Sequence, residues 1–229
     1  MNTSPFEILT DDRARAVLED LHSQADKQLP GLLMHYLPKI PSMILGRKIH
    51  FKDADMYGFY SDKFIALERE QAAFVYATAR SLRAKTVVEF GTSLGISTLW
   101  LAAAVKANGG GKVITTEIVP EKAAAAKRNF IKAGFEDYID VRVGDARETL
   151  RDIPGEVDLM LNDGFPNLAL DILKLLQPSM KIGGVVITDN IGTFKGNYAD
   201  YLGYVKDPSH GFVSVTLPFK AGTEYSVKT

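Results

Sequence analysis

From Thr86 onward, short runs of β-branched and apolar residues alternate with stretches of helical character. The predicted strands are Thr86–Phe90, Val113–Thr116, Ile139–Val143, Val157–Leu161 and Val185–Thr188. The predicted helices are Ile96–Lys106, Pro120–Ala133, Ala146–Asp152 and Asn167–Leu176. Strands that alternate with helices form a parallel sheet whose two faces the helices cover. The pattern therefore predicts an α/β chain with a doubly wound, mostly parallel sheet.

The segments outside this alternation have a different character. At the end of the chain, Phe212–Leu217 and Glu224–Val227 are predicted strands, joined by a connection of hairpin length. Before Thr86 the pattern is helical, with Thr10 as the predicted N-cap of a first helix that Pro30 and Gly31 end. Asp62–Arg83 is a second predicted helix. Prolines, glycines and aromatic residues between positions 31 and 60 predict little long regular structure there.

Composition excludes several classes of protein. The 229 residues can bury one large core, and 27 Lys and Arg against 28 Asp and Glu leave a net charge of −1. That balance argues against a chain built to bind nucleic acid or a membrane surface. With no cysteine, disulfides, thiolate metal sites and cysteine nucleophiles are excluded. Neither a secretory signal pattern nor an apolar run of membrane-spanning length is present, so we expect a cytoplasmic location.

The glycine-containing loop after the first predicted strand leaves three interpretations. For a nicotinamide dinucleotide site, the spacing from Gly91 to Gly95 differs from GxGxxG, and Glu89 would repel a pyrophosphate. The loop GTSLG also matches a nucleophile elbow around Ser93, and Asp163 or Asp189 followed by His210 supplies the chain order of a serine hydrolase. A hydrolase elbow usually follows several strands, however, and the 85 residues before this one are mostly helical.

The third interpretation is a site for S-adenosylmethionine. An acid beside the loop, Glu89, would attract the ammonium and the sulfonium of that ligand. Glu117 ends the second strand, where a carboxylate can accept hydrogen bonds from both ribose hydroxyls. Asp145 follows the third strand and can accept from the adenine amino group. Any one of these acids could instead cap a helix, but three at successive strand ends describe one ligand laid across the edge of the sheet.

Five segments then resemble a known family: VVEFGTSLGISTLWLA, ITTEIVPEKAAAAKRNF, VGDARETL, VDLMLNDG and GGVVITDN. They resemble class I S-adenosylmethionine-dependent methyltransferases, specifically the catechol and caffeoyl-CoA O-methyltransferase-like group. The resemblance implies a seven-stranded sheet with one reversed strand, a homodimer, and a cofactor domain over residues 61–229. The residues it implies for binding the methyl donor are Glu89, Gly91, Thr92, Ser93, Gly95, Ser97, Glu117, Ile118, Asp145, Ala146 and Asp163.

The same resemblance implies a divalent cation held by Asp163, Asp189 and Asn190, whose hard oxygen ligands suit Mg²⁺ or Ca²⁺. Asp163 is accordingly a predicted catalytic residue. The chain departs from the family at Pro166, where a lysine commonly serves as general base. Lys195, in the predicted loop after Asn190, is a candidate replacement, as are His35 and His50.

Residues 1–60 form an N-terminal helical and aromatic extension, expected to be a substrate lid or a dimer arm. Its residues expected to line an aromatic acceptor pocket are Met34, His35, Met56, Tyr57, Phe59 and Tyr60. The predicted function is methyl transfer from S-adenosylmethionine to a hydroxyl of a small, aromatic, catechol-like acceptor, assisted by a divalent cation. The alternatives are a protein that binds S-adenosylmethionine without turnover, because of Pro166, and a serine hydrolase that uses Ser93.

Overall fold

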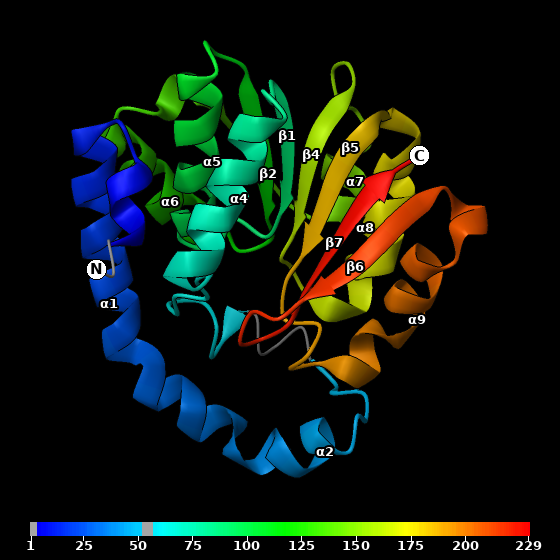
Figure 1. Ribbon diagram of the computed structural model, residues 1–229. Helices are drawn as coiled ribbons and strands as arrows, with labels where there is room; N and C mark the ends of the chain where they lie inside the picture. The colour runs from blue at the N-terminus through cyan, green and yellow to red at the C-terminus, as the bar shows by residue number, and fades with distance from the viewer. Residues whose placement is uncertain (1–3, 52–56) are drawn as a thin grey trace.

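The computed structural model describes residues 4–51 and 57–229. A seven-stranded sheet of order β3-β2-β1-β4-β5-β7-β6 runs through the molecule (Figure 1). Its strands are β1 (Thr86–Phe90), β2 (Lys112–Glu117), β3 (Ile139–Val143), β4 (Val157–Asn162), β5 (Met180–Thr188), β6 (Phe212–Leu217) and β7 (Thr223–Lys228). Strands β1 to β5 pair in parallel, and β7 pairs antiparallel with both β5 and β6. The predicted sheet with one reversed strand is confirmed.

The central strands are apolar along their whole length because both faces of the sheet are covered. Every residue of β4 is buried, as are the last four residues of β1 and the last five of β2. Such continuous apolar runs are typical of parallel strands between two layers of helices. The apolar runs after Thr86 that predicted the strands therefore reflect burial of both faces of the sheet.

Helices cover the two faces of the sheet in two groups (Figure 1). The first face carries α4 (Arg69–Ser81), α5 (Ile96–Ala107) and α6 (Pro120–Ala133), whose buried side chains form one core cluster. The second face carries α7 (Ala146–Thr149), α8 (Ala169–Leu176) and α9 (Lys195–Lys206), which form the other. The three-layer α/β architecture predicted from the alternation is thus confirmed.

The first helix, α1 (Asp12–Tyr36), differs from the prediction at both ends. Its N-cap is Asp11 and not Thr10, since the Asp11 side chain accepts a hydrogen bond from the Ala14 N–H at 3.0 Å. The helix also continues through Pro30 and Gly31. A proline inside a helix removes one backbone hydrogen bond. Both residues are exposed here, so the carbonyl that loses its partner can face water.

Three other helix predictions are corrected. Helix α4 begins at Arg69, seven residues after the predicted start at Asp62. Gln28 of α1 explains the difference, because its side chain accepts from the Phe64 N–H and donates to the Asp62 carbonyl, which holds this segment extended. The short α7 ends at Thr149, and residues 166–168 are a 3-10 turn before α8. Helix α9 was not predicted.

The end of α1, the 3-10 turn Leu37–Lys39 and α2 (Ile40–Ile44) form an arm that curves away from the sheet (Figure 1). No residue from 29 to 48 is buried, and large apolar side chains such as Met34 and Ile44 are 75% and 79% exposed. The arm returns to the body at Ile49, whose backbone N–H and carbonyl both bond to the Asn197 side chain. Within the described ranges, no helix has the length and apolar character needed to cross a membrane.

Candidate functional site

A cavity of about 400 Å³ lies at the carboxyl ends of the parallel strands. The strand order changes direction at β1, with β2 and β3 on one side and β4 and β5 on the other. Open α/β sheets bind ligands at such a position, because loops on the two sides separate there. The described residues around this cavity are Tyr36, Phe51, Tyr57, Tyr60, Ile65, Phe90, Gly91, Ser93, Thr116, Glu117, Ile118, Val119, Lys122, Gly144, Asp145, Ala146, Arg147, Asp163, Gly164, Phe165, Pro166, Asn167, Leu168, Asn190, Phe194 and Tyr198.

The loop from Gly91 to Gly95 packs tightly against its neighbours. Gly91 has a φ of +107°, and a Cβ there would lie 2.7 Å from the backbone oxygen of Asp163. Gly95 has a φ of +89°, and a Cβ there would collide with the Phe130 ring of α6. Only glycine adopts such backbone angles without strain. The two glycines therefore let this loop approach both the β4 loop and α6.

Ser93 and Glu117 face the cavity together. The Ser93 N–H donates to Glu117 Oε2 at 2.8 Å, and the Val119 N–H donates to Oε1 at 2.9 Å. Burial raises the pKa of the Glu117 carboxyl, and the Lys122 ammonium opposes that rise. The Ser93 Oγ is buried without a hydrogen-bond partner among the described residues. A fixed carboxylate next to an unpartnered hydroxyl can accept hydrogen bonds from the hydroxyls of a ligand.

Glu89, the acid beside the loop that was predicted to attract the methyl donor, does not line the cavity. Its side chain is fully buried. Its carboxylate accepts hydrogen bonds from Thr98 of α5 and from Thr115 of β2, and burial raises its pKa. The side chain therefore points into the junction between the sheet and α5. Three other residues that were predicted to contact the methyl donor do not line the cavity either: Thr92, Gly95 and Ser97.

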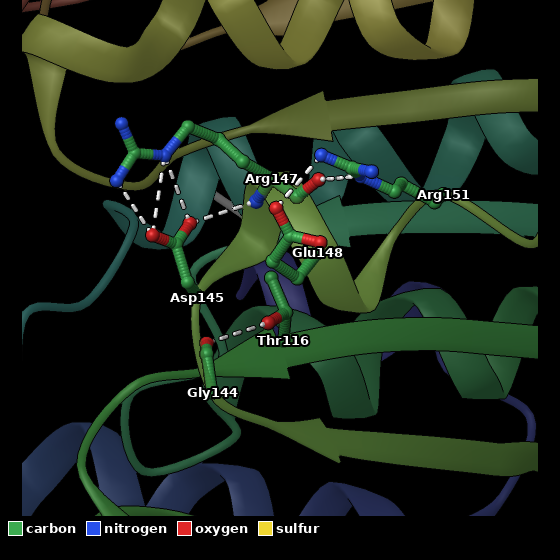
Figure 2. Close-up of polar contacts among 6 residues, drawn as sticks. All are labelled: Thr116, Gly144, Asp145, Arg147, Glu148 and Arg151. Atoms are coloured by element: carbon green, nitrogen blue, oxygen red, sulfur yellow. Dashed lines mark hydrogen bonds and ion pairs between the residues drawn. The ribbon is translucent and has the colours of Figure 1, made fainter.

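Asp145 lines the cavity with Ala146, and it is also the N-cap of α7. Figure 2 shows that its carboxylate accepts hydrogen bonds from the Arg147 N–H at 2.9 Å and from the Arg147 guanidinium, with Nη2 at 2.6 Å. The guanidinium holds the pKa of this carboxyl below its usual range. An adenine amino group at Asp145 would therefore share the carboxylate with Arg147.

Asp163, Asp189 and Asn190 lie together at the ends of β4 and β5. Burial and the charges of Asp189 and Glu89 raise the pKa of Asp163 well above its usual range. Burial also raises the pKa of Asp189 to about 6. Asn190, with a φ of +62°, donates from its side-chain amide to Asp189 Oδ2 at 2.8 Å. Asp163 and Asn190 line the cavity, while Asp189 is buried directly behind them.

Gln71 is a residue that the sequence did not single out. It lies on α4, is fully buried, and donates from one amide nitrogen to Asp189 Oδ1 at 2.7 Å and to Thr223 Oγ1 at 2.8 Å. No local pattern marks it, because its role depends on how α4 packs over β5 and β7. Its amide holds the Asp189 carboxylate from the side opposite Asn190.

Unpartnered polar atoms gather around this region. Within the described ranges, five buried side-chain polar atoms have no hydrogen-bond partner: Arg15 Nε, Gln71 Oε1, Glu89 Oε1, Ser93 Oγ and Asn162 Oδ1. All but the first belong to residues at or next to the strand ends that form the cavity. Buried polar groups are almost always paired, so unpaired ones call for a ligand, an ion or a water. The cluster fits a site built for a polar ligand.

The candidate bases from the sequence do not reach the cavity. Lys195 is not in a loop; it is the exposed first residue of α9 and does not line the cavity. His35 stacks on Phe59 at 3.7 Å between ring centroids, and His50 is exposed. His210 stacks on Tyr204, so no histidine among the described residues joins Ser93 in the cavity. The serine-hydrolase interpretation therefore lacks its base.

One end of the cavity is aromatic. Tyr57 and Tyr60 line it as predicted, whereas Met34, His35 and Phe59 do not, and Met56 lies outside the described residues. The other rings at this end come from the rest of the chain: Tyr36, Phe51, Phe165, Phe194 and Tyr198. Pro166, which stands where the family has lysine, is buried beside them. The cavity thus has a polar end near Glu117 and Asp145 and an aromatic end over Asp163 and Asn190.

Comparison with known proteins agrees with this geometry. A family profile described as a methyltransferase domain matches residues 88–191, which hold the glycine loop and all the strand ends around the cavity. Residues 88–191 are thus similar to a methyltransferase domain, as the five sequence segments predicted. The N-terminal extension lies outside the match.

Two relatives have catechol O-methyltransferase as their name. The chain is 33% identical over 128 residues to the one from Mycobacterium tuberculosis, which covers 56% of this chain and 57% of that protein. It is 28% identical over 131 residues to the one from Niastella koreensis, with 56% and 58% covered. The matched region thus spans a little over half the length of these relatives.

Solved structures show the same fold. An O-methyltransferase from Bacillus cereus in complex with SAH superposes with a TM-score of 0.64 and 20% identity, covering 72% of this chain and 83% of that one. The O-methyltransferase TomG from Streptomyces achromogenes, in complex with SAM, superposes with a TM-score of 0.62 and 19% identity. The match covers 79% of this chain and 92% of that one. At these identities the likeness concerns the fold.

Proposed function

We propose that this protein transfers a methyl group from S-adenosylmethionine to a hydroxyl of a small aromatic acceptor. The observation that carries the proposal is the cavity at the β1 switch point, with fixed acids at one end and aromatic rings at the other. When bound, S-adenosylmethionine supplies an electrophilic methyl group on a sulfonium. The acceptor oxygen forms the new C–O bond as the S–C bond breaks, which leaves S-adenosylhomocysteine as a neutral thioether, and the hydroxyl proton passes to water.

The residues present fit the methyl donor at the polar end of the cavity. Glu117 keeps free lone pairs beside its two backbone hydrogen bonds, so it can accept from ribose hydroxyls. The unpartnered Ser93 Oγ and the backbone at Gly91 lie next to it and can hydrogen-bond the polar groups of the donor. Glu89 acts from behind the wall, through its charge and through the position of β1.

The aromatic end of the cavity indicates an uncharged acceptor. Among the described lining residues, the cations are Lys122 and Arg147, and these accompany Glu117 and Asp145 at the polar end. The carboxylate or phosphate of an anionic acceptor would contact aromatic rings and the Asp163 carboxylate at this end, and no cationic side chain that the structure describes. Rings of this kind bury planar apolar surface well. We therefore expect neutral phenols and catechols to be better acceptors than hydroxylated aromatic acids.

A divalent cation is a further part of this proposal. Three oxygen ligands are available, from Asp163, Asp189 and Asn190. The two carboxylates repel each other, and a bound cation would offset that repulsion. Both Asp189 oxygens already accept from amides, of Gln71 and Asn190, so the Asn190 amide would have to rotate to offer its oxygen. A bound Mg²⁺ or Ca²⁺ would supply Lewis-acid activation of the acceptor hydroxyl.

The decisive experiment measures donor binding and turnover separately. Calorimetry with S-adenosylmethionine should show binding, which the Glu117→Gln variant should weaken at least tenfold. Glu121→Gln, at an exposed glutamate in the first turn of α6, is the matched control. Absence of binding by the wild type at millimolar donor would refute the function. Donor binding without methylation of any phenol or catechol would favour the alternative, a protein that binds the donor without turnover.

The cation is tested with the same assay. If the cation assists the reaction, methylation of catechol by the wild type should fall on treatment with EDTA and return with Mg²⁺. The methylation rate of the Asp189→Asn variant should change with neither treatment. Activity that survives both EDTA and the substitution would rule out the assignment of Asp163, Asp189 and Asn190 as ligands. Donor binding to the same samples shows whether a loss concerns the acceptor end alone.

For the N-terminal extension we propose a dimer arm made of residues 29–48. A helical segment of this length is marginally stable in water without tertiary contacts. Tyr36 and Met43 pack against the body, but several other apolar side chains of the arm are 64–79% exposed: Leu33, Met34, Leu37, Ile44 and Leu45. A second copy of the chain would cover them. Light scattering should show a dimer that Ile44→Asp dissociates, while Ile182→Asp, at an exposed residue of β5, leaves it intact. A monomeric wild type would refute the arm's role.

A further inference from the structure

Helix α9 brings a tyrosine to the aromatic end of the cavity. Tyr198 lines the cavity beside Asp163 and Asn190, and its side chain is only 1% exposed. Its ring packs edge-to-face on Tyr201, with the centroids 6.0 Å apart. The ring is therefore fixed between the second core cluster and the cavity.

The hydroxyl of Tyr198 has no hydrogen bond to another described residue, unlike those of Tyr201, Tyr60 and Tyr36. Tyr201 accepts from Thr188 Oγ1 at 2.5 Å, and Tyr60 donates to the hydroxyl of Tyr36 at 2.9 Å. Tyr57 is more than half exposed. Tyr198 thus presents an unengaged O–H donor, at the tip of a buried side chain, to the aromatic end of the cavity.

This hydroxyl keeps its proton. Burial and the negative charges of Asp163 and Asp189 raise the pKa of Tyr198 well above its usual range. A phenol hydroxyl in its ordinary protonated form is a hydrogen-bond donor. A ligand oxygen in the cavity can accept from this one, since no described residue does.

We propose that Tyr198 donates a hydrogen bond to an oxygen of the acceptor next to the oxygen that is methylated. Resting on the proposed function, this makes Tyr198 a specificity-determining residue that selects acceptors with two adjacent oxygens and fixes which of the two faces the methyl donor. Among the described lining residues no lysine lies at this end of the cavity, because position 166 is a proline and Lys195 is exposed.

The test compares Tyr198→Phe with Tyr201→Phe as matched control, since the Tyr201 hydroxyl is bonded to Thr188 and does not line the cavity. The acceptors are catechol and phenol, and donor binding is measured by calorimetry. Loss of one hydrogen bond corresponds to roughly a tenfold fall in kcat/KM. We expect that fall for catechol with Tyr198→Phe, little change for phenol, and unchanged donor binding.

A structural role would not change the position of methylation. The ratio of the two methylated isomers of a 4-substituted catechol should therefore shift with Tyr198→Phe and stay at the wild-type value with Tyr201→Phe. Equal losses for catechol and phenol, or an unchanged isomer ratio, would overturn the role of Tyr198 while leaving the proposed function intact. A wild type that methylates neither acceptor and binds no donor would overturn both.

Discussion

His22 should make the fold sensitive to acid. It is a buried residue of α1 that packs edge-to-face against Phe6, and the Trp100 indole N–H donates to its Nε2 at 3.4 Å. Burial, helped by the positive charge of Arg69, lowers the pKa of His22 from 6.5 to about 4. The folded protein therefore resists protonation at a site that the unfolded chain protonates readily.

The sign and size of the effect follow from these two values. Between pH 6.5 and pH 4 the unfolded chain binds more protons at His22 than the folded protein, so stability falls as the pH falls. From pH 7 to pH 5 the two pKa values correspond to a loss of about 2 kcal/mol in the free energy of unfolding. Below pH 4 the full loss is about 3 kcal/mol.

Urea unfolding at pH 7 and pH 5 measures this loss. Trp100, the one tryptophan of the chain, is fully buried, so its fluorescence reports the transition. His22→Gln keeps an acceptor for the Trp100 indole but carries no titrating group, so it should lose about 2 kcal/mol less than the wild type. His50→Gln, at an exposed histidine, should behave as the wild type. The same loss in wild type and His22→Gln would refute the reasoning.

Two further predictions concern the cavity wall. Gly91→Ala places a Cβ 2.7 Å from the Asp163 carbonyl at a φ of +107°, so we expect a loss of about 1–3 kcal/mol in thermal unfolding and weaker donor binding in calorimetry. Gln71→Leu removes the hydrogen bonds to Asp189 and Thr223, so we expect about 1–3 kcal/mol less stability in urea; a loss below about 0.5 kcal/mol would contradict this role.

The strands and the polar end of the cavity could be predicted because their signals are local. Each strand is an apolar run. Glu117 is the last residue of β2 and Asp145 lies two residues after β3, and the carboxyl ends of these strands meet at one edge of a parallel sheet. The direction in which a side chain points is harder to predict from the sequence. Glu89 precedes the loop by two residues, yet it faces Thr98 and Thr115 inside the protein, because the glycine turn starts only after Phe90.

The aromatic end was harder to predict because it depends on tertiary contacts. The spacing of Tyr198, Tyr201 and Val205 did fit a helix, but glycines among these residues weakened the signal for α9. Gln71 offers no signal at all, since any polar residue on α4 looks like a solvated position until the helix is packed on the sheet. Its partners, Asp189 and Thr223, lie 118 and 152 positions away in the sequence.

Asp163 lines the cavity with Asp189 and Glu89 buried behind it, and the negative charges of these three acids repel one another. Burial and the charges of Asp189 and Glu89 raise the pKa of Asp163, and burial raises the pKa of Asp189 to about 6. A positive charge in the cavity would lower both, so binding of a cationic ligand should release protons. Such a ligand should therefore bind more tightly as the pH rises through about 6.

S-adenosylmethionine and S-adenosylhomocysteine differ by the sulfonium charge and its methyl group, so the second ligand is the control for the first. If the sulfonium lowers the pKa of Asp189 from about 6 by about one, the ratio of the two affinities should rise about fivefold between pH 5 and pH 7. Asp189→Asn should flatten that rise, because its amide does not titrate. Calorimetry at several pH values gives the ratio directly. A ratio that does not change with pH in the wild type would mean that the sulfonium lies too far from these acids to change their pKa.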